Sequence, residues 1–436
     1  MTKKLLGSKM VDGATVLLAV VFGLVVFHAP LSVFFGQFAP PLLVKSWKEI
    51  IMLIVLLPLM FGAWQAGKLR YFNRNLLLCL ILLYALLHIV LLGFFASSAT
   101  QKLAGLAIDL RYELFFGLVL AALTLRPLAR RLFLKVGAAA AVLSMAFALL
   151  QVFVLPRDIL KYIGYSKHTI EPYLTVDSNK AFIRINGTLR GPNPLGAYAM
   201  MLLTLLAALL ARVKAVFAKH TVTFIIAIAA LLIVLWASYS RSALLGAGLS
   251  VGIIVCVRFG RKLSRQQLFG VGAVALVLVA IIFAARNSYL VQNVIVHSNP
   301  GHHESVDSNQ GHASSLLSSF NQMLHQPLGA GIGSTGSASL IGNQPLVIEN
   351  QYLFIAHEAG WLGLVIFLMI FGVVLTQLYK KRHDWLALGV FASGIGLAVI
   401  GLVQPVFVDD TISLVWWGLA AIALAAPALK KAKYSA

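Results

Sequence analysis

Long apolar runs recur along this chain and limit its fold more than any other feature. The hydrocarbon core of a bilayer needs about 20 apolar residues per helix. Of the 436 residues 60% are hydrophobic and 11% are charged, whereas soluble domains average roughly 25% charged residues. The chain is therefore predicted to be an all-α, polytopic membrane protein with about twelve membrane-spanning helices. The predicted spans are 13–35, 49–66, 75–95, 104–125, 133–155, 194–211, 221–239, 242–257, 267–285, 352–378, 385–404 and 412–429.

The basic residues orient these spans. Most of the 35 Lys and Arg residues fall in both termini and in alternate connections, so they lie on one side of the membrane. By the positive-inside rule that side is cytoplasmic. The net charge of +21 therefore indicates orientation, and we expect no nucleic-acid partner. The groups are Lys3, Lys4 and Lys9; Lys68, Arg70 and Arg74; Arg126, Arg130, Arg131 and Lys135; Arg212, Lys214 and Lys219; Arg258, Arg261, Lys262 and Arg265; Lys380, Lys381 and Arg382; and Lys430, Lys431 and Lys433.

Two long connections lie on the opposite, extracytoplasmic side. They cover about 156–193 and, between the ninth and tenth spans, about 286–351. No internal repeat or separate soluble domain is evident, so residues 1–436 are predicted to form a single membrane domain. The first apolar run is long and is read as a retained span rather than a signal peptide. Cys79 and Cys256 lie inside apolar runs and predict neither a disulfide framework nor a metal cluster.

The first polar motif is "RINGTLRGPNPLGAYAMM", residues 184–201. Asn193 is a good N-cap and Pro194 suits the first helical position, so we expect a helix that starts at the outer surface. Its positive dipole end would attract an anion, and Arg184 and Arg190 would strengthen that site for phosphate. The alternative is that these arginines only contact lipid phosphates at the interface.

Two further arginines stand near predicted span ends. Arg241, in "WASYSRSALLGAG", occupies a short outer turn and is either an anion ligand or a side chain that extends to the headgroups. Arg111, in "AIDLRYELFFG", stands between Asp109 and Glu113, which share one helix face. Ionisable residues at this depth normally face the bundle interior. Arg111 therefore belongs either to a structural ion-pair network or to the anion site.

The long outer loop is rich in histidine but not in a metal motif. The spacing of its histidines fits no compact ligand pattern, so neither a metal nor another cofactor is predicted. Apolar residues between Ser315 and Leu324 recur at helical spacing and predict a short amphipathic helix that lies on the membrane or caps a cavity. His312 precedes this helix and is a candidate catalytic group. The loop histidines are His297, His302, His303, His312 and His325.

The loop ends at "VIENQYLFIAHEAGWLG", where Glu349 and Asn350 precede a span. A carboxylate at this position could act as a general base. It could equally be a plain helix cap. His357 is a weaker candidate, seven residues after Asn350.

Four segments in this order resemble the O-antigen ligase and polymerase superfamily, whose members are polytopic bacterial enzymes. They are "GTLRGPNPLGAY", "SYSRSALLGAG", "HQPLGAGIGS" and "ENQYLFIAHEAGWLGLVIFL". The resemblance covers the central and C-terminal two-thirds of the chain; the first spans match only in hydropathy. It implies a metal-independent, inverting glycosyl transfer from undecaprenyl diphosphate to an acceptor glycan or lipid, outside the plasma (inner) membrane.

The resemblance also implies roles for residues. Carried over by motif, Arg190 and Arg241 hold the diphosphate, and a base activates the acceptor hydroxyl. Family ligases typically have a histidine where this chain has Glu349, and many members have an arginine where it has His312. The Glu-Asn pair is more like polymerase-type members, so a polymerase is slightly favoured over a ligase.

A lipid-linked oligosaccharide flippase or another transporter is the alternative class. Transporters usually bind substrate near the bilayer midplane, between repeated halves with broken helices. In this chain the polar motifs collect at the outer ends of spans, and no matching halves are evident. These observations favour a membrane enzyme whose partners are lipid-linked glycan, acceptor and membrane lipids.

Overall fold

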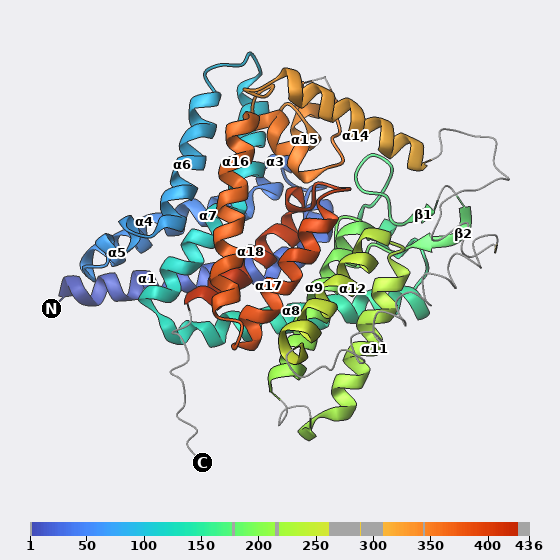
Figure 1. Cartoon of the computed structure of the whole chain (residues 1–436), viewed down its shortest axis with the longest axis horizontal. Coiled ribbons are helices and arrows are strands. Elements are labelled where there is room, and N and C mark those ends of the chain that lie inside the picture. Colours follow the sequence, from blue (N-terminus) through green and yellow to red (C-terminus); the bar gives the residue numbers. More distant parts are fainter. Residues whose placement is uncertain are drawn as a thin grey trace.

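The described part of the protein is built almost entirely of helices, with a two-stranded hairpin on its flank (Figure 1). The computed structural model describes residues 2–176, 179–213, 218–260, 288, 308–342 and 345–425, without the side chains of 2–6, 71, 73, 259 and 308–313. The α-helices are α1 (Thr2–Leu24), α2 (His28–Phe35), α3 (Pro41–Lys45), α4 (Trp47–Gln65), α5 (Leu69–Asn73), α6 (Leu76–Leu91), α7 (Ala99–Leu125), α8 (Arg130–Phe153), α9 (Pro192–Arg212), α11 (Thr221–Ala237), α12 (Arg241–Phe259), α14 (Ser308–His325), α15 (Gly336–Ser339), α16 (Gln351–Lys380), α17 (Trp385–Ile400) and α18 (Asp410–Ala425). The 3-10 turns are η1 (Val25–Phe27), η2 (Pro127–Ala129), η3 (Ile159–Ile163), η5 (Leu340–Gly342) and η6 (Val406–Val408), and the strands are β1 (Leu174–Val176) and β2 (Asn179–Arg184).

A helix occupies each predicted span except 267–285, which lies outside the described residues. Among the described residues, six helices are long and apolar enough to cross a membrane by length and composition, and four further apolar helices are shorter. The helix α7 is long, but its apolar sequence is interrupted by the charged residues Asp109, Arg111 and Glu113. The membrane class of the fold is supported, and the total of twelve spans stays a prediction.

The predicted outer connections contain regular structure of their own. Residues 156–193 include η3 and the antiparallel β1–β2 pair, in which Leu174 faces Arg184. The amphipathic helix predicted over 315–324 lies within α14. This helix packs along α16, where the Trp361 indole donates to the Met323 carbonyl at 2.8 Å. In Figure 1, α14 and the hairpin approach each other at the right-hand side of the molecule.

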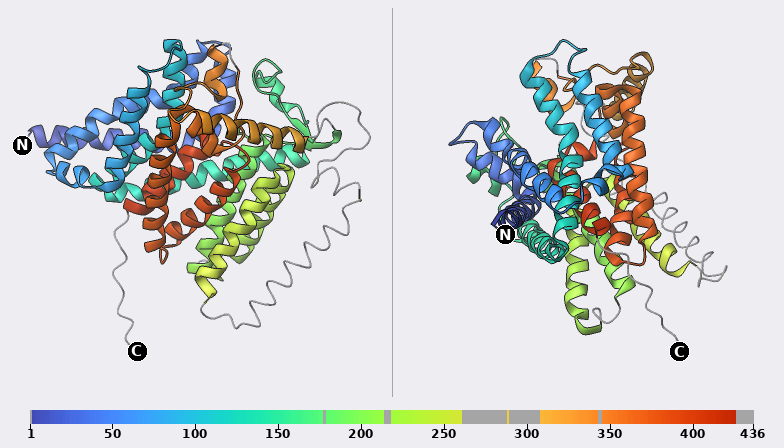
Figure 2. Two further views of the ribbon diagram at one scale, coloured as in Figure 1. Left: turned by 45° about the horizontal axis from the view of Figure 1, so that its top comes forward. Right: turned by 90° about the vertical axis from the view of Figure 1, so that its left-hand side faces the viewer.

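Small residues let α9, α12 and α17 approach closely. A Cβ added to Gly396 of α17 would lie 2.3 Å from Ser250 Oγ of α12, and one added to Gly196 of α9 would lie 2.7 Å from Ser238 Oγ. Glycine at helix contacts permits this packing in membrane bundles. In both views of Figure 2, α9, α11 and α12 form a group that extends away from α6. The contact at Gly196 presses the start of α9 against the turn before α12.

The long helix α16 is broken at Gly360, where φ is +69°. The segment at Pro327 enters this break: Trp361 N–H donates to the Pro327 carbonyl at 3.0 Å, and Ala330 N–H donates to the His357 carbonyl at 2.6 Å. A Cβ on Gly360 would lie 2.5 Å from the Pro327 oxygen, so only glycine fits here. The first turns of α16 are thus fixed to the end of α14.

Candidate active site

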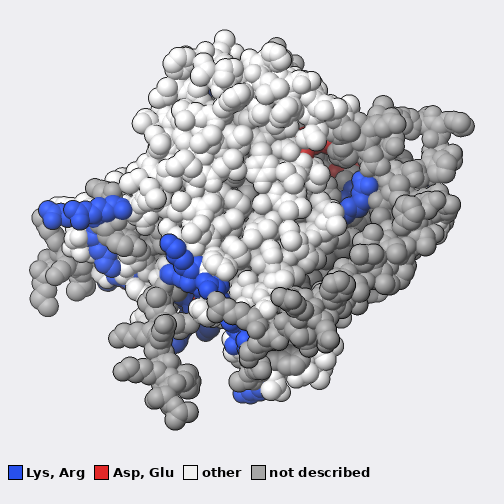
Figure 3. Space-filling model, in the orientation of Figure 1, with Lys and Arg blue, Asp and Glu red and all other residues white. Residues whose placement is uncertain are grey.

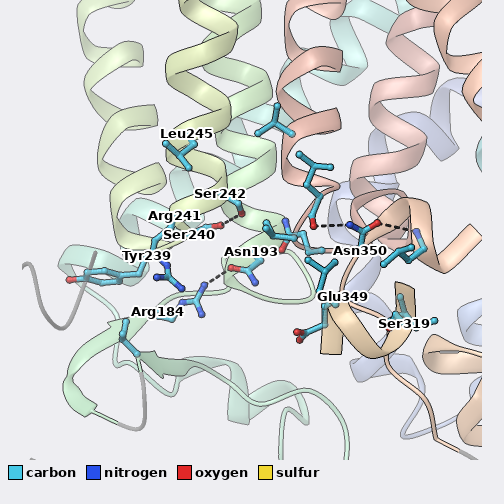
Figure 4. Close-up of a pocket in the computed structure, with 18 of the residues that line it drawn as sticks. Arg184, Asn193, Tyr239, Ser240, Arg241, Ser242, Leu245, Ser319, Glu349 and Asn350 are labelled. Carbon is cyan, nitrogen blue, oxygen red and sulfur yellow. Dashed lines mark hydrogen bonds between the residues drawn. The ribbon is translucent and has the colours of Figure 1, made fainter. Parts of the chain in front are cut away.

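A pocket of about 700 Å³ lies where several helix ends meet the hairpin (Figure 4). The starts of α9, α12 and α16, the end of α17, one face of α14 and the β1–β2 hairpin all contribute to its wall. Four of the residues predicted from the sequence share it. The lining residues are Thr175, Val176, Arg184, Asn193, Tyr239, Ser240, Arg241, Ser242, Leu245, Leu316, Ser319, Ile348, Glu349, Asn350, Leu353, Val399, Leu402, Val403 and Gln404.

Arg184 ends β2 and is held by two neutral oxygens. Its Nε donates to the Ser238 carbonyl at 3.0 Å, and its Nη2 donates to Asn193 Oδ1 at 2.5 Å. The planar guanidinium is therefore fixed between the hairpin, the start of α9 and the turn before α12. Neither oxygen carries a formal charge, so these two contacts orient the cation without neutralising it.

The start of α9 differs from the predicted one. The N-cap is Gly191 and the helix begins at Pro192, so the prediction of Asn193 as N-cap was wrong. Pro192 suits the first helical position as well as Pro194 does, and the Asn193 side chain accepts from Arg184 instead. Because both prolines lack an N–H, the first turn offers few amide donors. An anion at this position would therefore meet side-chain donors more than helix amides.

The turn between α11 and α12 is strained. Tyr239 has φ +48°, an uncommon value for a residue with a side chain. Its ring meets Phe182 edge-on at 6.1 Å and packs on Trp236 at 6.2 Å. Backbone strain of this kind is often found at functional sites. The strained turn leads directly into the start of α12, which lines the pocket.

Arg241 is the first residue of α12, and no side-chain hydrogen bond caps that helix. The first-turn amides and the positive dipole end therefore act at the pocket together with the guanidinium. Arg241, Ser242 and Leu245 line one wall, and Figure 4 shows them on the same side as Tyr239. The start of α12 therefore offers more hydrogen-bond donors to an anion than the start of α9 does.

Glu349 and Asn350 lie on the opposite wall. Asn350 is the N-cap of α16: its Oδ1 accepts from the amides of Tyr352 at 2.9 Å and Leu353 at 3.0 Å, and its Nδ2 donates to the Leu402 carbonyl at 2.8 Å. The N-cap of α16 is therefore Asn350 and not Glu349. Glu349, half-buried, faces the pocket from across Arg184 and Asn193 (Figure 4).

Two predicted residues, Arg190 and Arg111, do not line this pocket. Arg190 is exposed and lies near Asp409; burial raises the pKa of Asp409, and the positive charge of Arg190 opposes that rise. His312 belongs to α14, but its side chain is outside the described residues. The same helix contributes Leu316 and Ser319 to the wall.

Arg111 belongs to a separate group of charges. It is 7% exposed, contacts Asp410 and donates to the Val408 carbonyl. Lys48 Nζ lies 3.3 Å from Asp410 Oδ2, and His28 Nε2 lies 2.8 Å from the same oxygen. We call His28, Lys48, Glu49, Arg111 and Asp410 the ion-pair network. These contacts indicate that Arg111 belongs to a structural ion-pair network rather than to the anion site.

Glu358 is a residue whose role sequence reasoning missed. Its carboxylate is 1% exposed and accepts from the Gly333 amide at 2.8 Å and the Thr335 amide at 3.2 Å. Thr335 Oγ1 in turn donates to the Leu346 carbonyl at 3.0 Å. Leu346 stands three residues before Glu349, so Glu358 fixes the segment that leads into the pocket.

The same segment is fixed from α7. Gln101 Nε2 donates to the Gly333 carbonyl at 2.9 Å. A Cβ on Gly105 would lie 2.3 Å from Gly333 N, so the backbone at Gly333 packs directly against α7. The only signal in the sequence was "GAGIGS", whose glycines permit such an approach.

Among the described residues, no group of three or more His, Cys, Asp or Glu side chains is arranged to hold a metal ion. His297, His302 and His303 lie outside those residues. Cys79 and Cys256 are both free thiols. The expectation of a reaction without metal stays a prediction.

The apolar helices and the polar pocket at their ends define a polytopic membrane protein with one candidate active site in the part of the chain that is described. Residues 226–368 match the family model described as O-antigen ligase. This range contains Arg241, Glu349 and Glu358, and it supports the resemblance to the O-antigen ligase superfamily. No curated protein matches the chain. The match supports an O-antigen ligase-type role in polysaccharide assembly and a glycosyltransferase-like enzyme.

Proposed function

We propose that this protein transfers a glycan from undecaprenyl diphosphate to an acceptor hydroxyl, at the pocket between α9, α12, α14 and α16. The observation that carries the proposal is the meeting of Arg184, Arg241 and Glu349 around one cavity of about 700 Å³. The family match over residues 226–368 supports the class of reaction. The pocket lies on the extracytoplasmic side in this proposal, because the basic residues gather at the other ends of the helices.

In this proposal the arginines bind the diphosphate. When the bond between the sugar and the diphosphate breaks, the leaving oxygen takes the electron pair and negative charge grows on it. Arg241 and the uncapped start of α12 stabilise that charge, and Arg184 donates from the same side of the pocket, across from Glu349. Arginine suits this role because its planar fork binds phosphate oxygens in pairs. Arg190, exposed just before the start of α9, attracts the donor to this side of the molecule.

Glu349 is the proposed general base. It accepts the proton of the acceptor hydroxyl while that oxygen attacks the anomeric carbon from the face opposite the diphosphate, which inverts the configuration. Its position across the pocket from Arg184 fits such an in-line attack. His312 is the second candidate for this role, on the helix that closes the pocket. The Glu-Asn pair at 349–350 favours a polymerase, whose acceptor is another lipid-linked glycan, over a ligase.

The test uses purified protein in detergent, a radiolabelled undecaprenyl-diphosphate oligosaccharide and EDTA throughout. Release of undecaprenyl diphosphate is measured for the parent, Arg241→Ala and Glu349→Gln. We expect a loss of about 100- to 1000-fold for Arg241→Ala and at least about 100-fold for Glu349→Gln. Arg157→Ala, on the exposed connection after α8, is the matched arginine control and should keep the parent rate.

Each other outcome has a definite meaning. Release that stops in EDTA contradicts the metal-free reaction, and equal loss in Arg157→Ala contradicts a specific arginine site. Uptake of the intact donor into vesicles, without cleavage, assigns the protein to the transporter class. Chain-length analysis of the product separates polymerase from ligase.

A further inference from the structure

Three acidic side chains are buried near one another where α6 packs against α7 and α16. Asp109 and Glu113 of α7 are 6% and 1% exposed, and Glu358 of α16 is 1% exposed. Figure 3 shows a broad uncharged surface over α6 and α16, so these acids lie beneath an apolar exterior. Ionised carboxyl groups are costly in such an interior unless cations pair with them.

The charged residues of the neighbouring helices do not neutralise these acids. Lys48 and Glu49 are the only charged residues of α4, and Asp410 is the only one of α18; all three belong to the ion-pair network, as does Arg111. In the part of the chain that the structure describes, no Lys or Arg forms a salt bridge with the three acids. α15, α17, η5 and η6 contain no titratable side chain. The titratable groups that face the acids are Tyr84 and His88 of α6 and Tyr112 of α7.

The carboxyl groups of Asp109 and Glu358 are hydrogen-bonded to each other. Two carboxylates cannot form such a bond because both only accept, so one of the pair carries a proton. Both oxygens of Glu358 already accept backbone amides, from Gly333 at 2.8 Å and from Thr335 at 3.2 Å. Amide donors bind a carboxylate more strongly than a neutral acid. The proton therefore belongs to Asp109, which donates to Glu358.

A buried ring nitrogen is aimed at the same pair. His88 is 0% exposed; its Nδ1 donates to the Tyr84 carbonyl at 2.9 Å, and its Nε2 lies 3.5 Å from Asp109 Oδ2. Because the carbonyl can only accept, the hydrogen of a neutral His88 is on Nδ1, and Nε2 has a lone pair. Nε2 has no hydrogen-bond partner among the described residues. It is placed to accept the proton of Asp109 and to return it.

We propose that Asp109, Glu358 and His88 form a binding site for one proton, and that this proton holds the segment leading into the pocket. The hydrogen bond from Asp109 lets Glu358 keep its negative charge in the interior, and with it the two amide bonds to Gly333 and Thr335. Without the proton, two carboxylates would face each other and repel. None of these residues lines the pocket, so the proton site is separate from the site of the proposed reaction.

The test combines infrared spectroscopy with hydrogen exchange, on the purified protein in detergent at neutral pH. A protonated carboxyl group has a C=O stretching band that a carboxylate lacks. Asp109→Asn keeps an N–H donor for Glu358 but cannot hold the acidic proton. Asp109→Leu has a similar size and no donor. Glu113→Gln is the matched control, because it removes another buried acid of the same helix.

We expect Asp109→Asn to remove one protonated-carboxyl band and to keep exchange over residues 333–348 at the parent rate, because the bond to Glu358 is retained. Asp109→Leu should remove the same band and speed this exchange by roughly tenfold or more. Glu113→Gln should keep both the Asp109 band and the parent exchange rate.

Two results would overturn the proposal. If Asp109→Asn keeps every carboxyl band of the parent, Asp109 carries no proton and the site is wrong. If Asp109→Asn speeds exchange as much as Asp109→Leu does, the proton does not hold the segment. Where Asp109→Leu fails gel filtration, Asp109→Asn is judged alone by the same two criteria. Neither measurement uses glycan transfer, so failure here is distinct from failure of the proposed function.

Discussion

The pocket and the ion-pair network both bring arginine and carboxylate side chains into a largely apolar chain, but they hold them differently. In the network, Asp410 contacts Arg111, Lys48 and His28 within one group of buried and half-buried side chains. Trp47 Nε1 donates to His28 Nδ1 at 3.0 Å, so His28 presents a proton on Nε2 to Asp410. Opposite charges face each other directly, and the cations Lys48 and Arg111 are matched by the carboxylates Glu49 and Asp410.

At the pocket the charges surround a cavity. Arg184 donates to two neutral oxygens, and Arg241 begins a helix that no side chain caps. Glu349 stands across about 700 Å³ of open volume. The comparison teaches that residue type does not separate structural from functional arginines in this chain. In the network the charged groups contact one another directly, whereas at the pocket they line a space that a ligand can fill.

The largest expected effect is on stability, in Arg111→Ala. Removing one partner of a buried ion pair costs about 3–5 kcal/mol, and the low end applies here because Asp410 keeps Lys48 and His28. We expect a marked fall in Tm in detergent, measured by thermal unfolding, while Arg241→Ala leaves Tm nearly unchanged. If the Arg111→Ala protein is as stable as the parent but no longer binds the donor, Arg111 belongs to the anion site and not to a structural network.

The next effect concerns Glu358, which fixes the segment that leads into the pocket. Glu358→Gln leaves one oxygen to accept but turns an NH₂ toward the amide of Gly333 or Thr335. A buried donor without an acceptor costs about 1–3 kcal/mol. We expect faster hydrogen exchange over residues 333–348 and a transfer rate lowered by roughly tenfold or more.

Glu113→Gln is the matched control for that variant. Glu113 is also 1% exposed, and its carboxylate oxygens have no hydrogen-bond partner among the described residues. The same substitution there should leave exchange over 333–348 at the parent rate. If both variants change this segment alike, the effect arises from burial of the acids and not from the hydrogen bonds of Glu358.

The sequence was sufficient for the helices, because the length of an apolar run decides a membrane span almost alone. It was also sufficient to select Arg184, Arg241, Asn193 and Glu349, because polar residues at span ends in such a chain are few. Their sharing of one pocket depends on the contact of Gly196 with Ser238, between helices distant in sequence.

Other features depended on contacts that no local pattern encodes. Glu358 bonds an amide 25 residues before it. From the sequence, Gly360 is an ordinary glycine within a helix. In the structure its φ is +69°, and the segment at Pro327 packs into the resulting break. Two prolines at 192 and 194 made two helix starts equally acceptable, and the bond between Asn193 and Arg184 accompanies the earlier one.

The smallest expected effect tests the role of Asn193. This residue either binds substrate or positions Arg184. Asn193→Ala removes the acceptor of Arg184 Nη2 and leaves the bond from Nε to the Ser238 carbonyl. Because a hydrogen bond to a charged group contributes about 1.5–3 kcal/mol, we expect KM for the lipid-linked donor to rise about tenfold while kcat changes little. Asn179→Ala, in the same hairpin as Arg184 but outside the pocket lining, should keep the parent KM.

The double variant with Arg184→Ala separates the two roles. If Asn193 acts only through Arg184, the loss in kcat/KM in the double variant equals that of Arg184→Ala alone. Additive losses would mean that Asn193 contacts the donor directly. The side of the pocket formed by α9 would then bind substrate in its own right, as the uncapped start of α12 is proposed to do.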